Sequence, residues 1–140
     1  MMLLDTNILS ELMRQAPDPT VVAWLDERPG SDFFLSSVTR AEIELGIALL
    51  SEGRRKQALH EAAARMFEEL HGRCVSFDEA AASRYALLVA ARTRAGRPIT
   101  VEDGQIAAMA LAGGFDLVTR NVRDFDGIDG LVVVDPWGAS

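Results

Sequence analysis

Five short apolar runs separate longer segments of helical character along this chain of 140 residues, and this alternation restricts the fold more than any other feature. The runs cover residues 2–4, 33–36, 74–77, 117–119 and 131–134. They show no polar alternation, which is typical of strands that are covered on both faces. We therefore predict an α/β layer architecture with a parallel sheet of four or five short strands.

The segments between these runs carry helical periodicity and recognisable stop signals. Ile43 and Ile47 recur at helical spacing, and glycines follow several of the segments. We expect helices at 6–14, 19–27, 39–50, 54–71, 78–95 and 100–112, with a turn at 122–125. Because domains average roughly 150 residues, we expect residues 1–140 to form one domain.

The composition excludes several classes of protein. Cys74 is the only cysteine, and the two histidines are too few for a histidine-based metal site, so a disulfide scaffold, a zinc finger and a c-type haem protein are excluded. Lys56 is the only lysine, and no Gly-x-x-x-x-Gly-Lys-Ser/Thr loop is present, which excludes a P-loop nucleotidase.

The charge and the hydropathy pattern indicate a cytoplasmic protein. An acid at position 5 interrupts the first apolar run too early for a signal peptide, and no run approaches the roughly 18 apolar residues of a membrane span. The 21 acidic and 14 basic residues give a formal net charge of −7. On charge alone, nucleic acid is an unfavourable partner.

Four acidic residues follow predicted strands or begin predicted helices. They are Asp5, Glu42, Asp103 and Asp124. In an open parallel sheet, the carboxyl ends of the strands and the N-termini of the following helices share one edge, where ligands bind. We therefore expect these four side chains to converge at that edge.

Each acid taken alone also has a structural interpretation. Glu42 and Asp103 lie three residues after a threonine, so the pairs 39–42 and 100–103 both resemble capping boxes. Asp5 could cap the first helix, and Asp124 could belong to an Asx-turn.

Taken together, the acids favour a cation site. Several carboxylates at one edge, with no lysine to neutralise them, would repel one another in a partly dry cleft. Oxygen ligands select Mg²⁺ or Mn²⁺ over zinc, and such a site suits phosphoryl chemistry. Thr6 and Asn7 add a hydroxyl and an amide beside Asp5.

Five motifs spread from end to end resemble one known family. They are MLLDTNILS at 2–10, SSVTRAEIELG at 36–46, GRPITVEDGQIAA at 96–108, VTRNVRDF at 118–125 and VDPW at 134–137. The chain is similar to PIN-domain ribonucleases, specifically VapC-like and FitB-like toxins of type II toxin–antitoxin pairs.

The resemblance implies a single-domain α/β/α sandwich with a Mg²⁺ site at the sheet edge, where Mn²⁺ could substitute. Asp5 and Asp103 match the direct metal ligands, and Glu42 would complete the shell. Many relatives carry an aspartate where this chain has Asn121, so either Asp124 supplies the fourth carboxylate or it merely caps its turn.

The implied activity is hydrolysis of RNA phosphodiester bonds by a metal-activated water. The expected catalytic set is Asp5, Glu42, Asp103, Asn121 and Asp124. The expected supporting polar residues are Thr6, Asn7 and Thr119. The resemblance also implies a homodimer and a small antitoxin partner that supplies the DNA-binding part, so the chain alone would not bind DNA.

Five arginines are candidates to contact RNA phosphates, with a solvated helix face as the alternative interpretation. They are Arg92, Arg94, Arg97, Arg120 and Arg123. The aromatic residues lie mostly at core spacing and show no stacking stripe.

Two other functions compete with this interpretation. Receiver domains and haloacid-dehalogenase-type phosphatases also use acids at strand ends, but they require a lysine beside the site, and Lys56 lies far from any predicted strand. The second alternative is a catalytically silent PIN fold that binds RNA or an antitoxin without cleavage, which Asn121 favours.

Overall fold

The sheet that the sequence predicts is present and entirely parallel. A computed structural model describes residues 1–138 of the chain. Its strands pair in the order β3-β2-β1-β4-β5, and every neighbouring pair is parallel. The strands are β1 (Met2–Leu4), β2 (Phe33–Ser36), β3 (Cys74–Val75), β4 (Asp116–Val118) and β5 (Val133–Val134).

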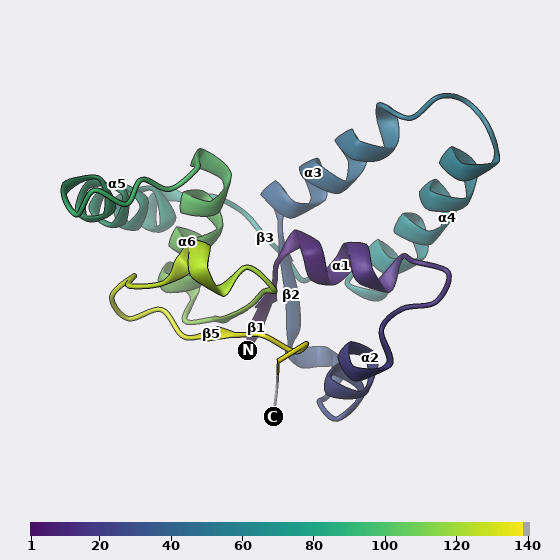
Figure 1. Cartoon of the computed structure of the whole chain (residues 1–140), viewed down its shortest axis with the longest axis horizontal. Coiled ribbons are helices and arrows are strands. Elements are labelled where there is room, and N and C mark those ends of the chain that lie inside the picture. Colours follow the sequence, from purple (N-terminus) through teal and green to yellow (C-terminus); the bar gives the residue numbers. More distant parts are fainter. Residues whose placement is uncertain (139–140) are drawn as a thin grey trace.

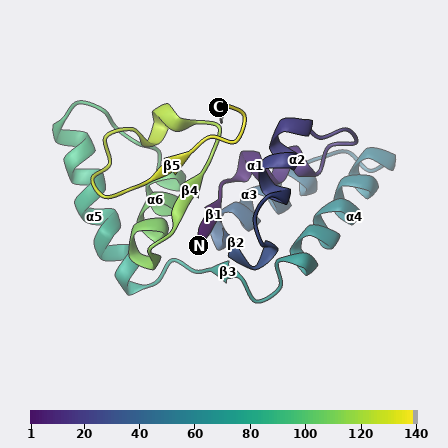
Figure 2. The ribbon, with the colours of Figure 1, turned by 90° about the horizontal axis from the view of Figure 1, so that it is seen from below.

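Helices lie on both sides of this sheet, which confirms the α/β/α arrangement. Figure 1 shows α5 and α6 on one side and α1 to α4 on the other, and the view in Figure 2 agrees. The helices are α1 (Thr6–Leu12), α2 (Pro19–Asp26), α3 (Ser37–Ala48), α4 (Arg54–Glu69), α5 (Glu79–Arg94) and α6 (Val101–Gly113). Short 3-10 turns cover Gly30–Asp32 (η1) and Val122–Phe125 (η2).

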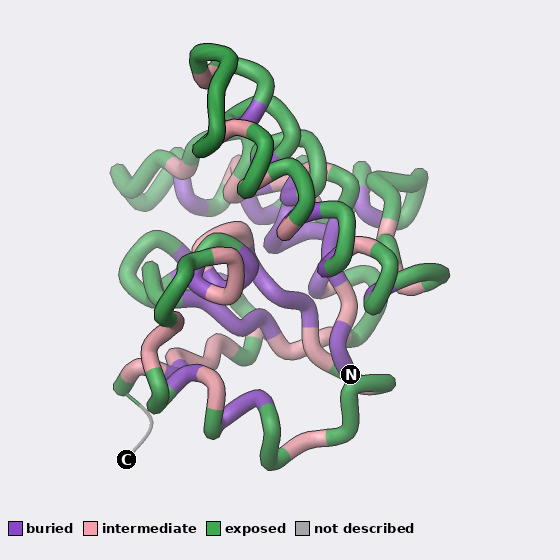
Figure 3. The backbone as a smooth tube through the Cα atoms, turned by 90° about the vertical axis from the view of Figure 1, so that its right-hand side faces the viewer, coloured by how far each residue is buried: buried purple, intermediate pink, exposed green. Residues whose placement is uncertain are grey.

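The two-residue period of a strand explains how one short sheet supports two cores. Leu3 and Leu4 are consecutive in β1 and point to opposite faces, as strand geometry requires. Leu3 belongs to the cluster formed with α5 and α6, whereas Leu4 belongs to the cluster formed with α1 to α4. Figure 3 shows the resulting buried segments in the middle of the fold.

Several predicted boundaries differ from the observed ones, and the start of α3 matters most for the site. The helix begins at Ser37 rather than Thr39, because Ser36 caps it by accepting a hydrogen bond from the Thr39 amide at 3.0 Å. The capping box expected at 39–42 is therefore wrong, and Glu42 lies in the second turn. At α6 the expected cap is present, since Thr100 Oγ1 accepts from the Asp103 amide at 3.2 Å.

The outer strands are shorter than expected because each pairs with its neighbour over two residues only. Cys74 and Val75 pair with β2, and Val133 and Val134 pair with β4, so the predicted strands 74–77 and 131–134 extend too far. Within residues 1–138, none of the helices has the length and apolar character that crossing a membrane requires.

The hairpin of α5 and α6 generates a prediction about two glycines. A Cβ at Gly104 in α6 would lie 2.9 Å from Tyr85 Cε2 and 3.2 Å from Val89 Cγ2, both on α5. At Gly46 in α3 a Cβ would meet nothing within 4 Å. Overpacking typically costs 1–3 kcal/mol, whereas a strain-free glycine-to-alanine change in a helix gains about 0.5–1 kcal/mol.

We therefore expect Gly104→Ala to lower the free energy of unfolding by about 1 kcal/mol, and Gly46→Ala to raise it by about 0.5–1 kcal/mol. Denaturant titration of both variants measures the difference. Equal stabilisation by the two substitutions would contradict the close approach of α5 to α6.

Candidate active site

Asp5 lies where β1 ends and α1 begins, and it is 5 % exposed. Its Oδ1 accepts a hydrogen bond from the Thr6 amide at 2.8 Å, so it caps α1. Its Oδ2 accepts from Thr119 Oγ1 at 2.8 Å and from Asn7 Nδ2 at 3.4 Å. Burial raises the pKa of Asp5 against the opposing effect of the Thr119 and Thr6 hydrogen bonds, and the charge of Asp124 raises it further.

Thr119 and Asn7 connect this carboxylate to the segment that follows β4. The Thr119 hydroxyl is fully buried and accepts from Asn7 Nδ2 and from the Asn121 amide, each at 3.1 Å. Asn7 Oδ1 in turn accepts from the Arg120 amide at 3.1 Å. The expected supporting residues therefore lie beside Asp5 and determine its orientation.

Glu42 reaches the same edge of the sheet from α3. Thr6 Oγ1 donates to Glu42 Oε1 at 2.8 Å and lies 3.2 Å from Thr39 Oγ1. Glu42 itself is exposed, so this hydrogen bond is what links its carboxylate to the start of α1.

Asp103 contributes the third carboxylate from the first turn of α6. The pKa of Asp103 rises from 3.8 to about 6, chiefly because the side chain is partly buried and next because of the charge of Asp5. The charges of Asp124 and Glu42 add to the rise, and a hydrogen bond with Thr100 opposes it. Asp5, Glu42 and Asp124 therefore all lie close enough to Asp103 to disfavour its ionised form.

One open pocket of about 520 Å³ brings the predicted residues together. Asp5, Glu42, Asp103 and Asn121 all line it, as do Thr6 and Asn7. Asp124 is not among the lining residues that the structure describes, although its charge raises the pKa of Asp103. The amide of Asn121, rather than the carboxylate of Asp124, therefore lies at the wall of the pocket.

The donor set fits a hard divalent cation. Carboxylate and amide oxygens are the ligands that Mg²⁺ and Mn²⁺ prefer, and an ion would offset the burial and the neighbouring charges that raise the pKa of Asp103. Within residues 1–138, no group of three or more His, Cys, Asp or Glu side chains is placed to hold a metal ion on its own. Mg²⁺ in proteins is usually bound by one or two carboxylates and several waters, and Asp5 and Asp103 could supply that number.

Four residues of the pocket were not expected from the sequence: Ser10, Glu11, Arg14 and Trp137. Glu11 is buried and accepts from the Asp18 amide at 2.9 Å, with Arg14 Nη1 at 3.0 Å from its Oε2. Its position four residues after Asn7 on one helix face is a signal that could have identified it.

Trp137 could have been identified from the strand order. It follows β5, which pairs with β4, so it lies at the same carboxyl edge as the acids. That inference requires the pairing of β5 with β4, which its short sequence does not specify.

The arginines expected to contact phosphate lie in different places. Among the residues that the structure describes, Arg120 is the one of the five that lines the acidic pocket. Arg97 is 3.7 Å from Asp126 and lines a separate pocket of about 300 Å³ between α5 and residues 127–129.

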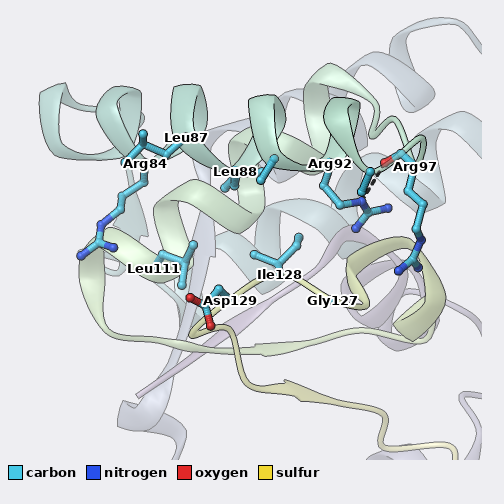
Figure 4. Close-up of a pocket in the computed structure, with 11 residues that line it drawn as sticks. Arg84, Leu87, Leu88, Arg92, Arg97, Leu111, Gly127, Ile128 and Asp129 are labelled. Atoms are coloured by element: carbon cyan, nitrogen blue, oxygen red, sulfur yellow. Dashed lines mark hydrogen bonds between the residues drawn. The ribbon is translucent and has the colours of Figure 1, made fainter.

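Arg92 is a correction to the phosphate-contact set. It is 8 % exposed, and its guanidinium donates to the backbone carbonyls of Arg97 at 2.7 Å, Asp124 at 3.2 Å and Asp126 at 3.0 Å. Figure 4 shows it beside this second pocket with its bond to Arg97 drawn. Its hydrogen bonds hold η2 against α5, so it is not available to RNA.

The chain is similar to known proteins over nearly its whole length. The PIN domain family matches residues 2–131. The chain is 41 % identical to Toxin FitB of Neisseria gonorrhoeae (strain ATCC 700825 / FA 1090) over 138 residues, which cover 98 % of this chain and 99 % of that protein. It is 37 % identical to VapC ribonuclease Y4jK of Sinorhizobium fredii (strain NBRC 101917 / NGR234) over 98 % of each chain. The structure of FitAB bound to the IR36 DNA fragment has a TM-score of 0.92 at 39 % identity, and covers 100 % of this chain and 98 % of that one.

The raised pKa of Asp103 predicts how its neutralisation changes stability with pH. Between pH 3.8 and about 6 the folded state binds more protons at Asp103 than the unfolded state, so this carboxyl reduces stability as the pH rises through that window. In EDTA, Asp103→Asn should therefore unfold at a higher temperature than the wild type at neutral pH, and the difference should shrink towards pH 4. Thermal melts across this range measure it. Asp129→Asn, an exposed carboxylate outside the pocket, is the matched control, and an equal gain in both variants would contradict the prediction.

The hydrogen bonds of Thr119 predict a second stability effect. Thr119→Val keeps the shape of the side chain but removes the donor to Asp5 and the acceptor for Asn7. Because unsatisfied buried polar groups cost about 1–3 kcal/mol, we expect a loss of that order in the free energy of unfolding. Thr119→Ser retains the hydroxyl and should recover most of the loss. Denaturant titration distinguishes them, and equal losses would show that packing rather than hydrogen bonding is responsible.

Proposed function

The chain belongs to the PIN-domain family, and we propose that it is a metal-dependent endoribonuclease that acts as the toxin of a toxin–antitoxin pair. One observation carries the proposal. Three carboxylates from separate elements, Asp5, Glu42 and Asp103, line a single pocket, where burial and then the charges of the neighbouring acids raise the pKa of Asp103 to about 6. The similarity to VapC ribonuclease Y4jK supports RNA as the substrate.

The residues of the pocket have distinct roles in this proposal. Asp5 and Asp103 would hold the cation, and Glu42 would complete its shell. When bound, Mg²⁺ supplies a positive charge that polarises the phosphate oxygens and lowers the pKa of a water. Thr119 and Asn7 hold the Asp5 carboxylate through their hydrogen bonds, so the ligand oxygens are oriented before a cation or substrate arrives.

Asn121, where many relatives carry a fourth acid, has no charge. Asn121 lies at the pocket wall with an amide that can accept or donate a hydrogen bond but adds no negative charge. Asp124 acts on the site through its charge, which raises the pKa of Asp5 and Asp103. We propose that Asn121 orients a water or the substrate and that Asp124 strengthens the attraction for the cation.

We also propose an antitoxin as the protein partner. One similar protein is Toxin FitB, and one similar solved structure is that of FitAB bound to a DNA fragment. An acidic pocket attracts a cationic side chain as well as a metal, so an arginine of the partner would block the site by occupying it. In this proposal the chain forms a homodimer, and DNA binding requires the complex.

Cleavage of RNA by the purified protein tests the activity. With Mg²⁺ or Mn²⁺, the wild type should cut a mixed-sequence RNA, and EDTA should stop it. Asp5→Asn and Asp103→Asn should each reduce the rate by at least about 100-fold, since even groups outside the ligand shell typically cost 10- to 100-fold. Circular dichroism should show both variants folded. Mapping of the RNA 5′ ends would give the cleavage sites.

Asp129→Asn is the matched control for loss of a carboxylate, and it should cleave at the wild-type rate because Asp129 lies outside the acidic pocket. Full activity of Asp103→Asn, or of the wild type in EDTA, would contradict the metal mechanism. A wild type that binds RNA without cutting it under either metal would instead favour the silent interaction module, the alternative that Asn121 supports.

A further inference from the structure

A tryptophan and an arginine from different segments meet at the rim of the acidic pocket. Trp137 follows β5, and its amide donates to Asp135 Oδ1 at 2.9 Å. The Arg120 Cζ atom lies 4.8 Å from the centroid of the Trp137 ring. Both residues line the pocket that contains Asp5, Glu42 and Asp103. The pair thus places a planar cation and an aromatic ring next to the carboxylates.

The position of this pair is linked to Asp5 by a short series of hydrogen bonds. The Arg120 amide donates to Asn7 Oδ1 at 3.1 Å, and the Nδ2 of the same Asn7 lies 3.4 Å from Asp5 Oδ2. Asn7 Nδ2 also donates to Thr119 Oγ1 at 3.1 Å. These bonds hold the backbone of Arg120 next to the Asp5 carboxylate, so the side chain of Arg120 starts from a defined point beside the acids.

We infer that Arg120 and Trp137 form a stacking platform for one unpaired nucleobase of the RNA, beside the bond that is cut. The inference rests on the proposed function and adds a residue, Trp137, that holds one base of the substrate. Unpaired bases are recognised by stacking on aromatic rings and on arginine planes. A base held in a duplex does not expose its face, so the platform selects single-stranded segments.

The charge of the pocket makes such a platform useful. The carboxylates repel the phosphates of the substrate. Apart from the attraction of a bound cation, favourable contacts with the RNA therefore have to come from other residues of the pocket. A base that stacks on Arg120 and Trp137 is uncharged, so the carboxylates do not repel it. The guanidinium can also bind a neighbouring phosphate. In the described part of the chain Arg120 forms no salt bridge, so RNA would not have to break an ion pair to reach its guanidinium.

A purely structural role for the pair makes a different prediction. Trp137 is half-buried and packs against the core cluster that contains α1 to α4, so removing it will cost some stability. A structural tryptophan would affect folding but would not make RNA affinity depend on a base at one position. The experiment therefore measures the contribution of individual bases rather than activity alone.

The test measures binding of a short fluorescent single-stranded oligouridylate to Asp103→Asn protein with Mg²⁺, so that the RNA is not cut. A series of oligonucleotides carries an abasic site at each position in turn. With Trp137 present, one abasic position should weaken binding by about 5- to 100-fold, the range typical for loss of one stacked base. With Trp137→Ala added, intact RNA should bind more weakly by a similar factor, and that abasic position should have no further effect.

Four further variants separate stacking from a loss of folding or of surface charge. Trp137→Phe retains a ring and should recover most of the affinity and the sensitivity to the abasic site. Arg120→Gln should weaken binding, whereas Arg55→Gln, at an exposed position in α4, should not. Because the chain has two tryptophans, Trp24→Phe leaves Trp137 as the only indole, and the oligouridylate should quench its fluorescence.

Each contrary result separates the two proposals. RNA that binds equally well with and without Trp137, with an identical abasic profile, overturns the platform and leaves the ribonuclease proposal intact. A folded wild-type protein that binds no RNA at all overturns the proposed function and the platform with it. Weaker binding by Trp137→Ala that is the same for every abasic oligonucleotide overturns the platform in favour of a structural role or a surface for a protein partner.

Discussion

The hydrogen bonds of the Asp5 carboxylate join the sheet, the first helix and the acidic pocket. One oxygen satisfies an N–H at the start of α1, and the other accepts from Thr119, which follows the neighbouring strand β4. The Asp5 amide also donates to the Val118 carbonyl at 2.9 Å, in continuation of the ladder between β1 and β4. Because these bonds cross from one strand to the next, the orientation of the acid depends on the parallel register of the sheet. The carboxylate therefore serves as a helix cap and as a pocket ligand at once, and neither interpretation excludes the other.

Mutual repulsion of the acids is the cost of this arrangement, and it changes what net charge implies. The formal charge of −7 makes nucleic acid an unfavourable partner for the protein as a whole. The rise in the pKa of Asp103 shows that part of this charge is concentrated at one edge, where burial and three other carboxylates disfavour its ionised form. A bound divalent cation would favour the ionised forms and reverse the local potential. The net charge therefore describes the protein without a bound ion. A phosphate in the pocket would be attracted by the ion and by Arg120.

Local signals were enough to predict the strands, the parallel sheet and the approach of Asp5, Glu42 and Asp103 to one edge. The start of α3 was missed because Ser36 and Thr39 are both good caps, and only the end of β2 at Ser36 decides between them. Arg92 was misassigned because its sequence position does not reveal that the carbonyls of Asp124 and Asp126 fold back over α5. Contacts between residues this far apart in the chain leave no periodic pattern in the sequence from which they could be predicted.

The same rule that locates the acids also explains why Trp137 was overlooked. Residues that follow parallel strands gather at one edge, and Asp5, Ser36 and Thr119 follow or end β1, β2 and β4. β5 pairs over only two residues, and such a short segment has no pattern that would predict β4 as its neighbour. Once that pairing exists, Asp135, Pro136 and Trp137 must leave the sheet at the edge where the carboxylates are. One of the two shortest strands of the fold therefore brings to the pocket an aromatic ring that lies within reach of Arg120.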